Sequence, residues 1–323
     1  MKRHVAITAA ILVLVVAVCG SAYMVRNPEH ASIDDAARKS APGRFIRLSD
    51  GVTHYDVSGP GSGRLVVLVH GFSVPYYIWD STAAALAGAG FRVMRYDEYG
   101  RGWSDRPNVE YTADLYDRQL GELLDSLHVR DKIDLAGVSM GGWVAGTFTA
   151  RHANRVRTLT LIDPVAGRTA ESLGKFGTPV IGELLWQYEA VPKLPDGQAG
   201  DFLEPQRFPG WADRYREQMR YHGFGRSLLS TRRATLNANM DTVYASVGRT
   251  PVPVLLLWGM SDRTVPLERS TGVRLAMPNA DFHAIRGAAH LPILEQASTT
   301  DSLMLVFLAR SAAPSASPVT TSK

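Results

Sequence analysis

Apolar and polar residues along the middle of the chain follow a repeated order of strand, turn and helix. Runs that predict strands lie at residues 64–70, 91–96, 133–136, 159–162, 252–258 and 282–285. Stretches that predict helices lie between several of them, at residues 79–87, 112–127 and 140–152. Because continuous apolar runs are typical of strands buried on both faces, the pattern predicts an α/β fold with a mostly parallel central sheet and helices on both faces.

Two further stretches refine that fold. Residues 45–48 and 52–57 predict a leading antiparallel hairpin ahead of the parallel strands. Residues 166–248 are rich in Trp, Tyr and Arg, contain several prolines and lack strand-like apolar runs. Because this stretch lies between two predicted strands, we expect a mostly helical cap inserted over the carboxyl edge of the sheet, where open α/β sheets bind their ligands.

The N-terminal end has a different pattern. Lys2 and Arg3 precede an uncharged stretch at residues 5–24, and about 20 residues of helix rise about 30 Å, the thickness of a bilayer's hydrocarbon core. We expect residues 1–24 to be a membrane signal anchor, with a cleaved signal peptide and a lipoprotein signal at Cys19 as alternatives. All three place the rest of the chain outside the cytoplasm, because the two cations favour the cytoplasmic side.

The remaining segments complete the predicted organisation. Residues 25–42 are polar and predict a short tether, and residues 43–310 form one α/β domain that includes the cap. Residues 311–323 are rich in Ser, Pro and Thr and cannot build a core, so we expect a disordered tail.

Composition narrows the classes of protein that remain. Hydrophobic residues make up 45% of the 323 residues and charged residues 20%, which is typical of a folded soluble domain and excludes a disordered chain or a multi-span membrane protein. The net charge of +4 comes without a basic stripe, so nucleic acid is not an expected partner. The single cysteine excludes a disulfide within the chain. Composition leaves the oligomeric state open.

The candidate chemistry begins at Ser139, the centre of the sequence Gly-Val-Ser-Met-Gly at residues 137–141. The motif follows a predicted strand and opens a predicted helix. A nucleophilic serine exposed on such a tight turn requires small residues two positions before and after it. The helix N-terminus adds backbone N–H groups that face a developing anion. We therefore predict that Ser139 is a nucleophile.

A serine hydroxyl is a weak nucleophile and needs a base oriented by a carboxylate. Among the nine histidines, His290 follows the last predicted strand in a turn, which places it at the same sheet edge as Ser139. Asp262 lies in the turn after the strand at 252–258 and is the predicted carboxylate, with Asp163, at the end of the preceding strand, as the alternative.

An oxyanion hole needs two backbone N–H groups near the nucleophile. One is predicted to come from Met140, directly after Ser139, and the other from Phe72 in the loop after the strand at 64–70. Gly71 allows the chain to turn sharply there, and His70 is placed to shape this loop rather than to reach the serine.

Over residues 43–310 the chain resembles the α/β-hydrolase superfamily. The motifs that carry this resemblance occur in the superfamily's usual order: His70-Gly71-Phe72, Tyr96-Asp97 with Gly100-Arg101-Gly102 and Ser104, the elbow around Ser139, residues 259–262 and residues 287–290. They are similar to the branch of monoglyceride lipases, carboxylesterases and ring-cleavage C–C hydrolases with helical caps. The resemblance implies acyl transfer to water through a serine ester, with no metal and no organic cofactor.

The expected function is a serine hydrolase that cleaves carboxylic esters, either small-molecule or lipid esters such as acylglycerols. A C–C bond hydrolase and a non-catalytic ligand-binding protein of this fold are the alternatives. An exposed apolar face of the cap would favour lipid substrates, whereas packing of the same residues on the core would not. The residues concerned are Phe176, Leu184, Leu185, Trp186, Phe202, Phe208 and Trp211.

Overall fold

A computed structural model describes residues 25–167 and 172–311, together with scattered positions between residues 4 and 21. In this part of the chain, eight strands form one sheet in the order β1-β2-β4-β3-β5-β6-β7-β8. The strands are β1 Arg44–Leu48, β2 Gly51–Ser58, β3 Leu65–Val69, β4 Arg92–Tyr96, β5 Ile133–Val138, β6 Val156–Ile162, β7 Val254–Gly259 and β8 Asp281–Ile285. β1 and β2 form an antiparallel hairpin, β2 pairs antiparallel with β4, and β3 to β8 run parallel. The predicted mostly parallel sheet with a leading hairpin is confirmed.

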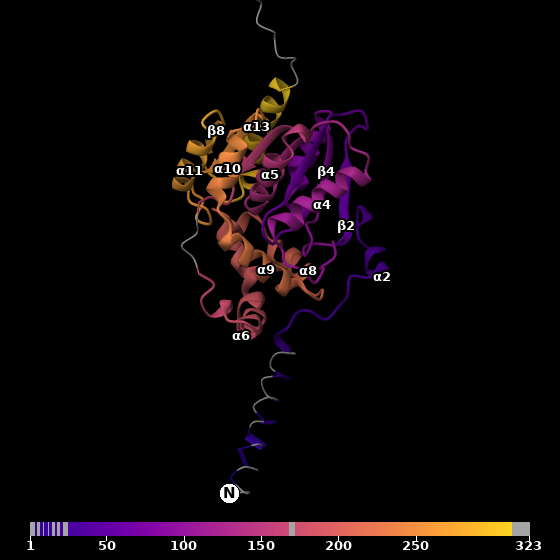
Figure 1. Ribbon diagram of the computed structural model, residues 1–323, viewed down its shortest axis with the longest axis vertical. Helices are drawn as coiled ribbons and strands as arrows, with labels where there is room; N and C mark the ends of the chain where they lie inside the picture. Colours follow the sequence, from indigo (N-terminus) through magenta and orange to yellow (C-terminus); the bar gives the residue numbers. More distant parts are fainter. Residues whose placement is uncertain are drawn as a thin grey trace, which may run out of the picture.

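Helices cover both faces of this sheet (Figure 1). The helices are α2 Asp35–Arg38, α3 Asp80–Gly88, α4 Ala113–Ser126, α5 Met140–Arg151, α6 Ile181–Leu185, α7 Leu194–Gly197, α8 Trp211–Met219, α9 Phe224–Asn237, α10 Met240–Gly248, α11 Ser270–Ala276, α12 Pro292–Glu295 and α13 Ala297–Arg310. α5 packs on β5 and β6 with α4 and α10 beside it, whereas α3 and α13 pack together on the other face.

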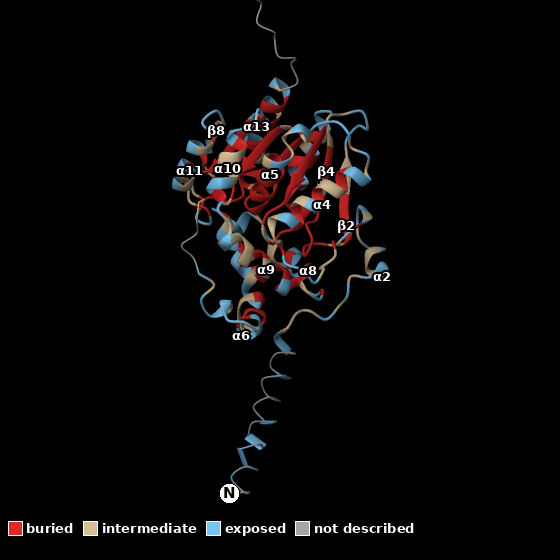
Figure 2. Cartoon of the chain, in the orientation of Figure 1, coloured by how far each residue is buried: buried red, intermediate tan, exposed pale blue. Residues whose placement is uncertain are grey.

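The alternation of side chains along β3 shows why the apolar run is continuous. Val67 and Val69 belong to the core on one face of the sheet, and Val66 and Leu68 belong to the core on the other. All four are buried, and Figure 2 shows that the central strands of the sheet are buried with them. Because successive side chains of a strand point to opposite faces, a strand covered on both sides needs apolar residues at every position.

The register of the parallel strands brings their carboxyl ends to one edge. Val138 pairs with Ile162, and Ile162 pairs with Leu257. The ladder continues one residue further, because the Ser139 N–H donates to the Ile162 carbonyl at 2.9 Å and the Asp163 N–H donates to the Leu257 carbonyl at 3.0 Å. The residues that follow β5, β6 and β7 therefore lie side by side.

The segment between β6 and β7 is helical where the structure describes it, with α6 to α9 lying beyond the carboxyl edge of the sheet (Figure 1). α10, which ends at Gly248, packs against α5 and α11 and so belongs to the layer that covers the sheet. A cap extending to residue 248 was therefore too long by this helix, because Tyr244 and Val247 are buried in the core of the main domain.

Most of the apolar cap residues that the sequence analysis considered are packed inside. Trp186 and Phe202 are buried, and Phe176, Phe208 and Trp211 pack against the same core as partly buried rings. Phe176 meets Trp186 edge-on, with ring centroids 5.4 Å apart. Of the two arrangements left open by the sequence, packing on the core is the one found for these aromatic residues, while Leu184 is exposed together with Val180 and Ile181.

The predicted anchor at 1–24 and tail at 311–323 fall largely outside the described residues. None of the helices among the residues described here is both long and apolar enough to cross a membrane. The segment predicted as a tether contacts the cap, since Ala31 forms a parallel bridge with Tyr221. Glu29 accepts the backbone N–H groups of Gly223 and Gly225 at 2.6 and 2.7 Å, so its carboxylate satisfies donors at the start of α9.

Candidate active site

Ser139 lies on a strained turn between β5 and α5. Its φ of 56° and ψ of −120° are unusual for a residue other than glycine. A Cβ on Gly137 would lie 2.2 Å from the Gly141 carbonyl oxygen, and a Cβ on Gly141 would lie 2.4 Å from the carbonyl oxygens of Val69 and His70. Both positions therefore require glycine, which is the physical reason for the spacing seen in the sequence.

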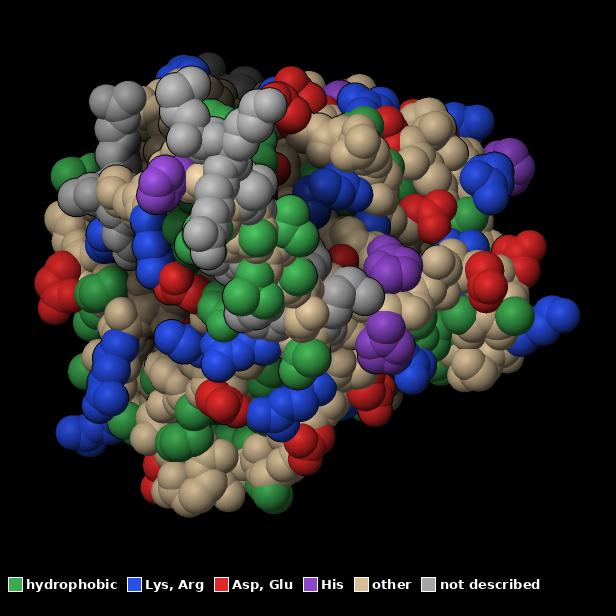
Figure 3. Space-filling view, turned by 90° about the horizontal axis from the view of Figure 1, so that it is seen from below, with side chains coloured by type: hydrophobic (Ala, Val, Ile, Leu, Met, Phe, Trp, Pro, Cys, Tyr) green, Lys and Arg blue, Asp and Glu red, His purple; other side chains and the backbone are tan. Residues whose placement is uncertain are grey.

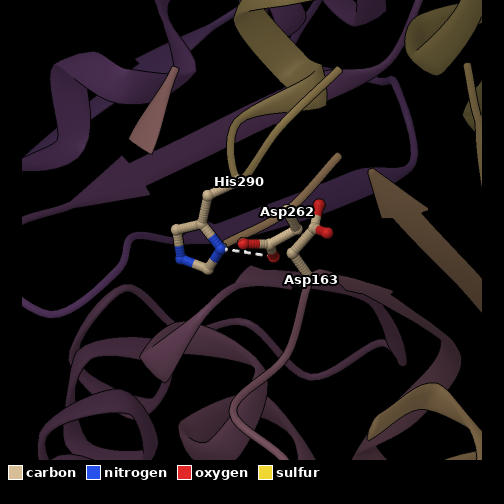
Figure 4. Close-up of side chains that lie close together, drawn as sticks. All are labelled: Asp163, Asp262 and His290. Carbon is tan, nitrogen blue, oxygen red and sulfur yellow. Dashed lines mark hydrogen bonds and ion pairs between the residues drawn. The ribbon is translucent and has the colours of Figure 1, made fainter. Parts of the chain in front are cut away.

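The three residues predicted as a triad are connected by two hydrogen bonds, both made by His290. The Ser139 Oγ is 2.9 Å from His290 Nε2, and His290 Nδ1 is 2.7 Å from Asp262 Oδ2. With Nδ1 donating to the carboxylate, Nε2 of a neutral imidazole is left to accept the serine proton. Figure 4 shows the imidazole and the carboxylate of Asp262 in this arrangement.

Neighbouring groups hold the base and the carboxylate in place. The other oxygen of Asp262, Oδ1, accepts the N–H groups of Thr264 and Val265 at 2.8 and 2.9 Å. The backbone N–H of His290 donates to the Asp201 carbonyl at 3.0 Å, which connects the loop that carries His290 to the cap. Buried Glu295 accepts the Ala289 N–H at 2.7 Å and thereby fixes the residue before His290.

The electrostatic surroundings favour a protonated His290 more than water does. Burial lowers the pKa of His290, but the hydrogen bond and the negative charge of Asp262, with a smaller contribution from Asp201, outweigh it and leave the pKa raised. A base with a raised pKa takes a proton from serine more readily, and the imidazolium that forms is stabilised by the same carboxylate.

Asp163, the alternative carboxylate, lies next to Asp262 but has a different environment (Figure 4). Its Oδ1 accepts the Gly259 N–H at 2.7 Å, and its φ of 43° is left-handed. Burial and the neighbouring charge of Asp262 raise the pKa of Asp163 well above its usual range. Asp163 therefore holds a proton more readily than an ordinary carboxyl group does.

Asp163, Asp262 and His290 each present one potential metal-ligating atom, and these atoms lie within 4.8 Å of one another. Each of the three groups already has a hydrogen-bond partner, since His290 is bonded to Asp262 and both carboxyl groups accept backbone N–H groups. The arrangement is that of a hydrogen-bonded network around a base.

The loop after β3 passes directly beside the nucleophile. A Cβ on Gly71 would lie 3.4 Å from Ser139 Cβ. The His70 ring donates from Nδ1 to the Gly71 carbonyl at 2.8 Å and accepts the Glu98 N–H at Nε2 at 2.9 Å. Burial lowers the pKa of His70 to about 4, which agrees with this neutral form.

Arg101 also holds this loop in place, although no role was predicted for it from the sequence. Its Nε donates to the Phe72 carbonyl at 2.8 Å, and the fully buried guanidinium also contacts the hydroxyl groups of Tyr116 and Thr231. With the carbonyl groups of both Gly71 and Phe72 held in this way, the orientation of the peptide groups next to Ser139 is set. Arg101 stands between two glycines in a stretch that also holds several charged residues, so no local signal set it apart.

Two cavities meet at Ser139, with volumes of about 370 and 190 Å³. Both are lined by Phe72, Ser139, Arg232 and Thr264. His290 lines the larger cavity, and Met140 lines the smaller one. Arg232 lies on cap helix α9, and nothing in the sequence pattern distinguished it from the other cap arginines.

The other histidine of note, His54, lies away from this site. Its Nδ1 is 2.7 Å from Asp97 Oδ2, and both side chains line a separate cavity of about 260 Å³. Its second ring nitrogen contacts the Pro42 carbonyl. An imidazole with an acceptor at each nitrogen is best satisfied when it is protonated.

A nucleophile elbow at the carboxyl edge of a largely parallel sheet, covered on both faces by helices, defines the α/β-hydrolase class of proteins. The model of the alpha/beta hydrolase family matches residues 66–300. The chain belongs to this family, and the protein is a hydrolase.

Several described proteins are similar in sequence to most of this chain. A putative non-heme haloperoxidase of Mycobacterium phage D29 is 28% identical and covers 81% of this chain and 94% of its own. The 2-hydroxy-6-oxononadienedioate/2-hydroxy-6-oxononatrienedioate hydrolase 1 of Dechloromonas aromatica is 27% identical over 84% of this chain and 96% of its own. Among solved structures, a bacterial membrane phospholipase A is 22% identical with a TM-score of 0.67, and the match covers 96% of this chain and 99% of that one. The last likeness shows a shared fold.

Proposed function

We propose that the protein is a serine hydrolase that cleaves carboxylic esters through an acyl-enzyme. The observation that carries the proposal is the hydrogen-bonded chain from Asp262 through His290 to Ser139, with distances of 2.7 and 2.9 Å. The nucleophile, base and carboxylate needed for acyl transfer are all placed by loops at one sheet edge.

In the proposed reaction, Ser139 Oγ attacks the ester carbonyl carbon while His290 Nε2 accepts the hydroxyl proton. The negative charge that forms on the carbonyl oxygen is stabilised by the N–H groups of Phe72 and Met140. When the C–O bond of the ester breaks, His290 protonates the departing alcohol. Water then attacks the acyl-enzyme by the same route and releases the carboxylic acid and free Ser139. Asp262 stabilises the imidazolium in both steps.

The two cavities suggest how an ester would lie. The departing alcohol must be close to His290, which lines the cavity of about 370 Å³, so we assign the alcohol portion to that side. The acyl portion then occupies the cavity of about 190 Å³ beside Met140, with Val165 and Leu236 in its walls. The larger alcohol side fits a bulky alcohol such as a glycerol derivative.

A C–C bond hydrolase is the second candidate, because relatives such as the Dechloromonas enzyme act on dicarboxylate ring-cleavage products by their name. Arg232 and Arg269 line the smaller cavity, and a guanidinium group is suited to bind a substrate carboxylate. An uncharged ester does not need such a group, so the two candidates differ in their dependence on these arginines.

We also propose that residues 1–24 anchor the protein in a membrane, with the catalytic domain outside the cytoplasm. The support is the uncharged stretch at 5–24 behind Lys2 and Arg3. The phospholipase with the same fold, described as a membrane protein, matches nearly the whole chain. Retention of the full chain in the pellet after alkaline washing of membranes would support this anchor, and release into the supernatant would contradict it.

The experiment that tests the catalytic proposal compares the full chain with its Ser139→Ala variant on p-nitrophenyl esters from acetate to palmitate. A 2-hydroxy-6-oxo-dienoate is offered in parallel. Ester turnover that is lost in the variant supports the esterase. Turnover of the dienoate alone supports the second candidate. Failure on both substrates, with no labelling of Ser139 by a fluorophosphonate, overturns both.

A further inference from the structure

A small aliphatic cluster projects from one corner of the cap. The cluster consists of Val180, which directly precedes α6, and of Ile181 and Leu184 within it, and these residues are 67%, 59% and 54% exposed. Their spacing places them on neighbouring positions of one helical turn. We call these three residues the cap corner. Trp186, just beyond the cap corner, is buried and donates its indole N–H to the Gly225 carbonyl at 2.9 Å. This contact fixes the cap corner against the packed interior of the cap.

The cap corner lies next to the point where the N-terminal segment joins the domain (Figure 1). Gln187, one turn after Leu184, donates to Asn27 Oδ1 at 2.8 Å and to Glu29 Oε1 at 2.9 Å. The Arg26 guanidinium lies over the Tyr188 ring at 4.7 Å from its centroid. Glu29, Val180 and Leu184 line one surface hollow of about 660 Å³. The chain is therefore bound to the cap from residue 26 onwards, directly beside the aliphatic cluster.

We infer that the cap corner inserts into the surface of the lipid bilayer that holds the N-terminal segment. This inference rests on the proposed membrane anchor. The predicted anchor ends at residue 24, and the tether contacts the cap from residue 26. Because so few residues lie between these two points, the domain must lie close to the membrane surface. Aliphatic side chains of a domain held this close to the membrane enter the boundary between headgroups and acyl chains, to a depth of about 5–10 Å.

The charges around the cap corner are compatible with that position. Glu183, on α6, pairs with Arg233 at 3.0 Å, and Glu189 pairs with Lys175. The acidic groups at positions 183 and 189 are thus paired with cations, and cations suit an anionic lipid surface. The face seen in Figure 3 carries both basic and acidic side chains, with hydrophobic ones among them.

The consequence for the enzyme is that its cap faces the bilayer. α9, whose first turn is held by Glu29, also carries Arg232 of the two active-site cavities. Contact of the cap corner with lipid is therefore linked through the cap to the site where substrate binds, which fits a substrate drawn from the membrane.

The test measures the depth of a probe in the full chain. Cys19 is the single cysteine, so a Cys19→Ser background accepts one new thiol, either Ile181→Cys or Leu275→Cys. Leu275 is a matched control, since it is 78% exposed on α11, which lies farther from the N-terminal segment along the long axis than α6 does (Figure 1). Both variants carry a fluorophore and are reconstituted in phosphatidylethanolamine–phosphatidylglycerol vesicles with or without a headgroup-level nitroxide lipid.

We expect the nitroxide lipid to quench most of the fluorescence at position 181 and little at position 275. Equal quenching at the two positions overturns the inference, as does no quenching at position 181 in protein that remains in the membrane. Disulfide cross-linking between two Ile181→Cys chains without quenching overturns it in favour of contact between two copies. If the protein leaves the membrane on alkaline washing, the anchor itself is wrong. None of these readings depends on ester hydrolysis.

A second measurement uses Ile181→Glu combined with Leu184→Glu. We expect hydrolysis of an ester embedded in vesicles to fall about tenfold, because two aliphatic side chains lose their burial in lipid, while hydrolysis of soluble p-nitrophenyl butyrate stays unchanged. Leu275→Glu should alter neither rate. An equal loss on both substrates would point to damage within the cap and would contradict the membrane contact.

Discussion

Asp163 and Asp262 lie side by side at the ends of neighbouring strands β6 and β7, and Asp262 is the one whose carboxylate meets the imidazole of His290 at 2.7 Å. Burial and the charge of Asp262 raise the pKa of Asp163 well above its usual range. A second carboxyl group in a buried site is harder to ionise beside the first, because like charges repel each other and burial disfavours charge.

Asp163→Asn should leave kcat/KM within a few-fold of the wild type. The amide replaces a carboxyl group whose pKa is raised, and its oxygen still accepts the Gly259 N–H. Asparagine also tolerates the left-handed backbone found there. Asp262→Asn is the control and should lower kcat about 10⁴-fold. A loss of that size in the Asp163 variant would show that the carboxyl group at 163 is the one that orients the base.

Ser139→Ala should lower kcat on a p-nitrophenyl ester by about 10⁵–10⁶-fold, because the nucleophile and its base act as a unit. The variant should also lose labelling by a fluorophosphonate while its circular dichroism spectrum is unchanged. Ser302→Ala, on the exposed side of α13, serves as the control and should keep full activity. Residual labelling of the Ser139 variant would mean that another serine reacts.

The acid limb of kcat/KM should lie above pH 6.5, the ordinary pKa of histidine, because the pKa of His290 is raised. The proposed base accepts a proton only when neutral, so activity falls as the pH drops through that raised value. In Asp262→Asn the burial that lowers the pKa remains and the raising charge is gone, so the acid limb of the residual activity should move to lower pH. An unchanged limb would contradict the role of Asp262.

The pair of His54 and Asp97 should make stability depend on pH. Burial opposes a charge on His54, but the charge and hydrogen bond of Asp97 and the Pro42 carbonyl raise its pKa above 6.5. The resulting stability is fully present below the unfolded pKa and is lost as the pH rises through the higher folded value. His54→Leu should therefore reduce the free energy of unfolding in urea more at about pH 6 than at about pH 9. A difference that is the same at both pH values would contradict a charged imidazole.

Glu29→Ala should release the tether from the cap. The carboxylate accepts two backbone N–H groups and the Gln187 amide, so its removal should cost about 1–3 kcal/mol locally. The measurement is hydrogen exchange at the amides of Gly223 and Gly225, which should exchange faster. Glu110→Ala, an exposed residue that lines the same hollow, is the control and should leave both amides protected. Unchanged protection in Glu29→Ala would show that the cap does not depend on the tether.

The sequence alone predicted the elements and the residues placed by local geometry. Apolar runs such as 64–70 identified strands buried on both faces, because such strands need apolar residues at every position. The glycines at 137 and 141 marked the turn at Ser139, since a side chain at either position would collide with the neighbouring backbone. His290 and Asp262 followed from their positions after strands whose carboxyl ends share one edge.

The tertiary structure alone decided how distant segments meet. No local pattern indicated that Arg101 would hold the Phe72 carbonyl, that Glu29 of the tether would bind the first turn of α9, or that α10 would pack on α5 instead of joining the cap. The aromatic side chains of the cap are packed inside, whereas Val180, Ile181 and Leu184 are exposed. No local pattern indicated this difference either. Contacts between residues far apart in the chain depend on how the packed elements fit together, and a helix or strand pattern records only which face is buried, not what covers it.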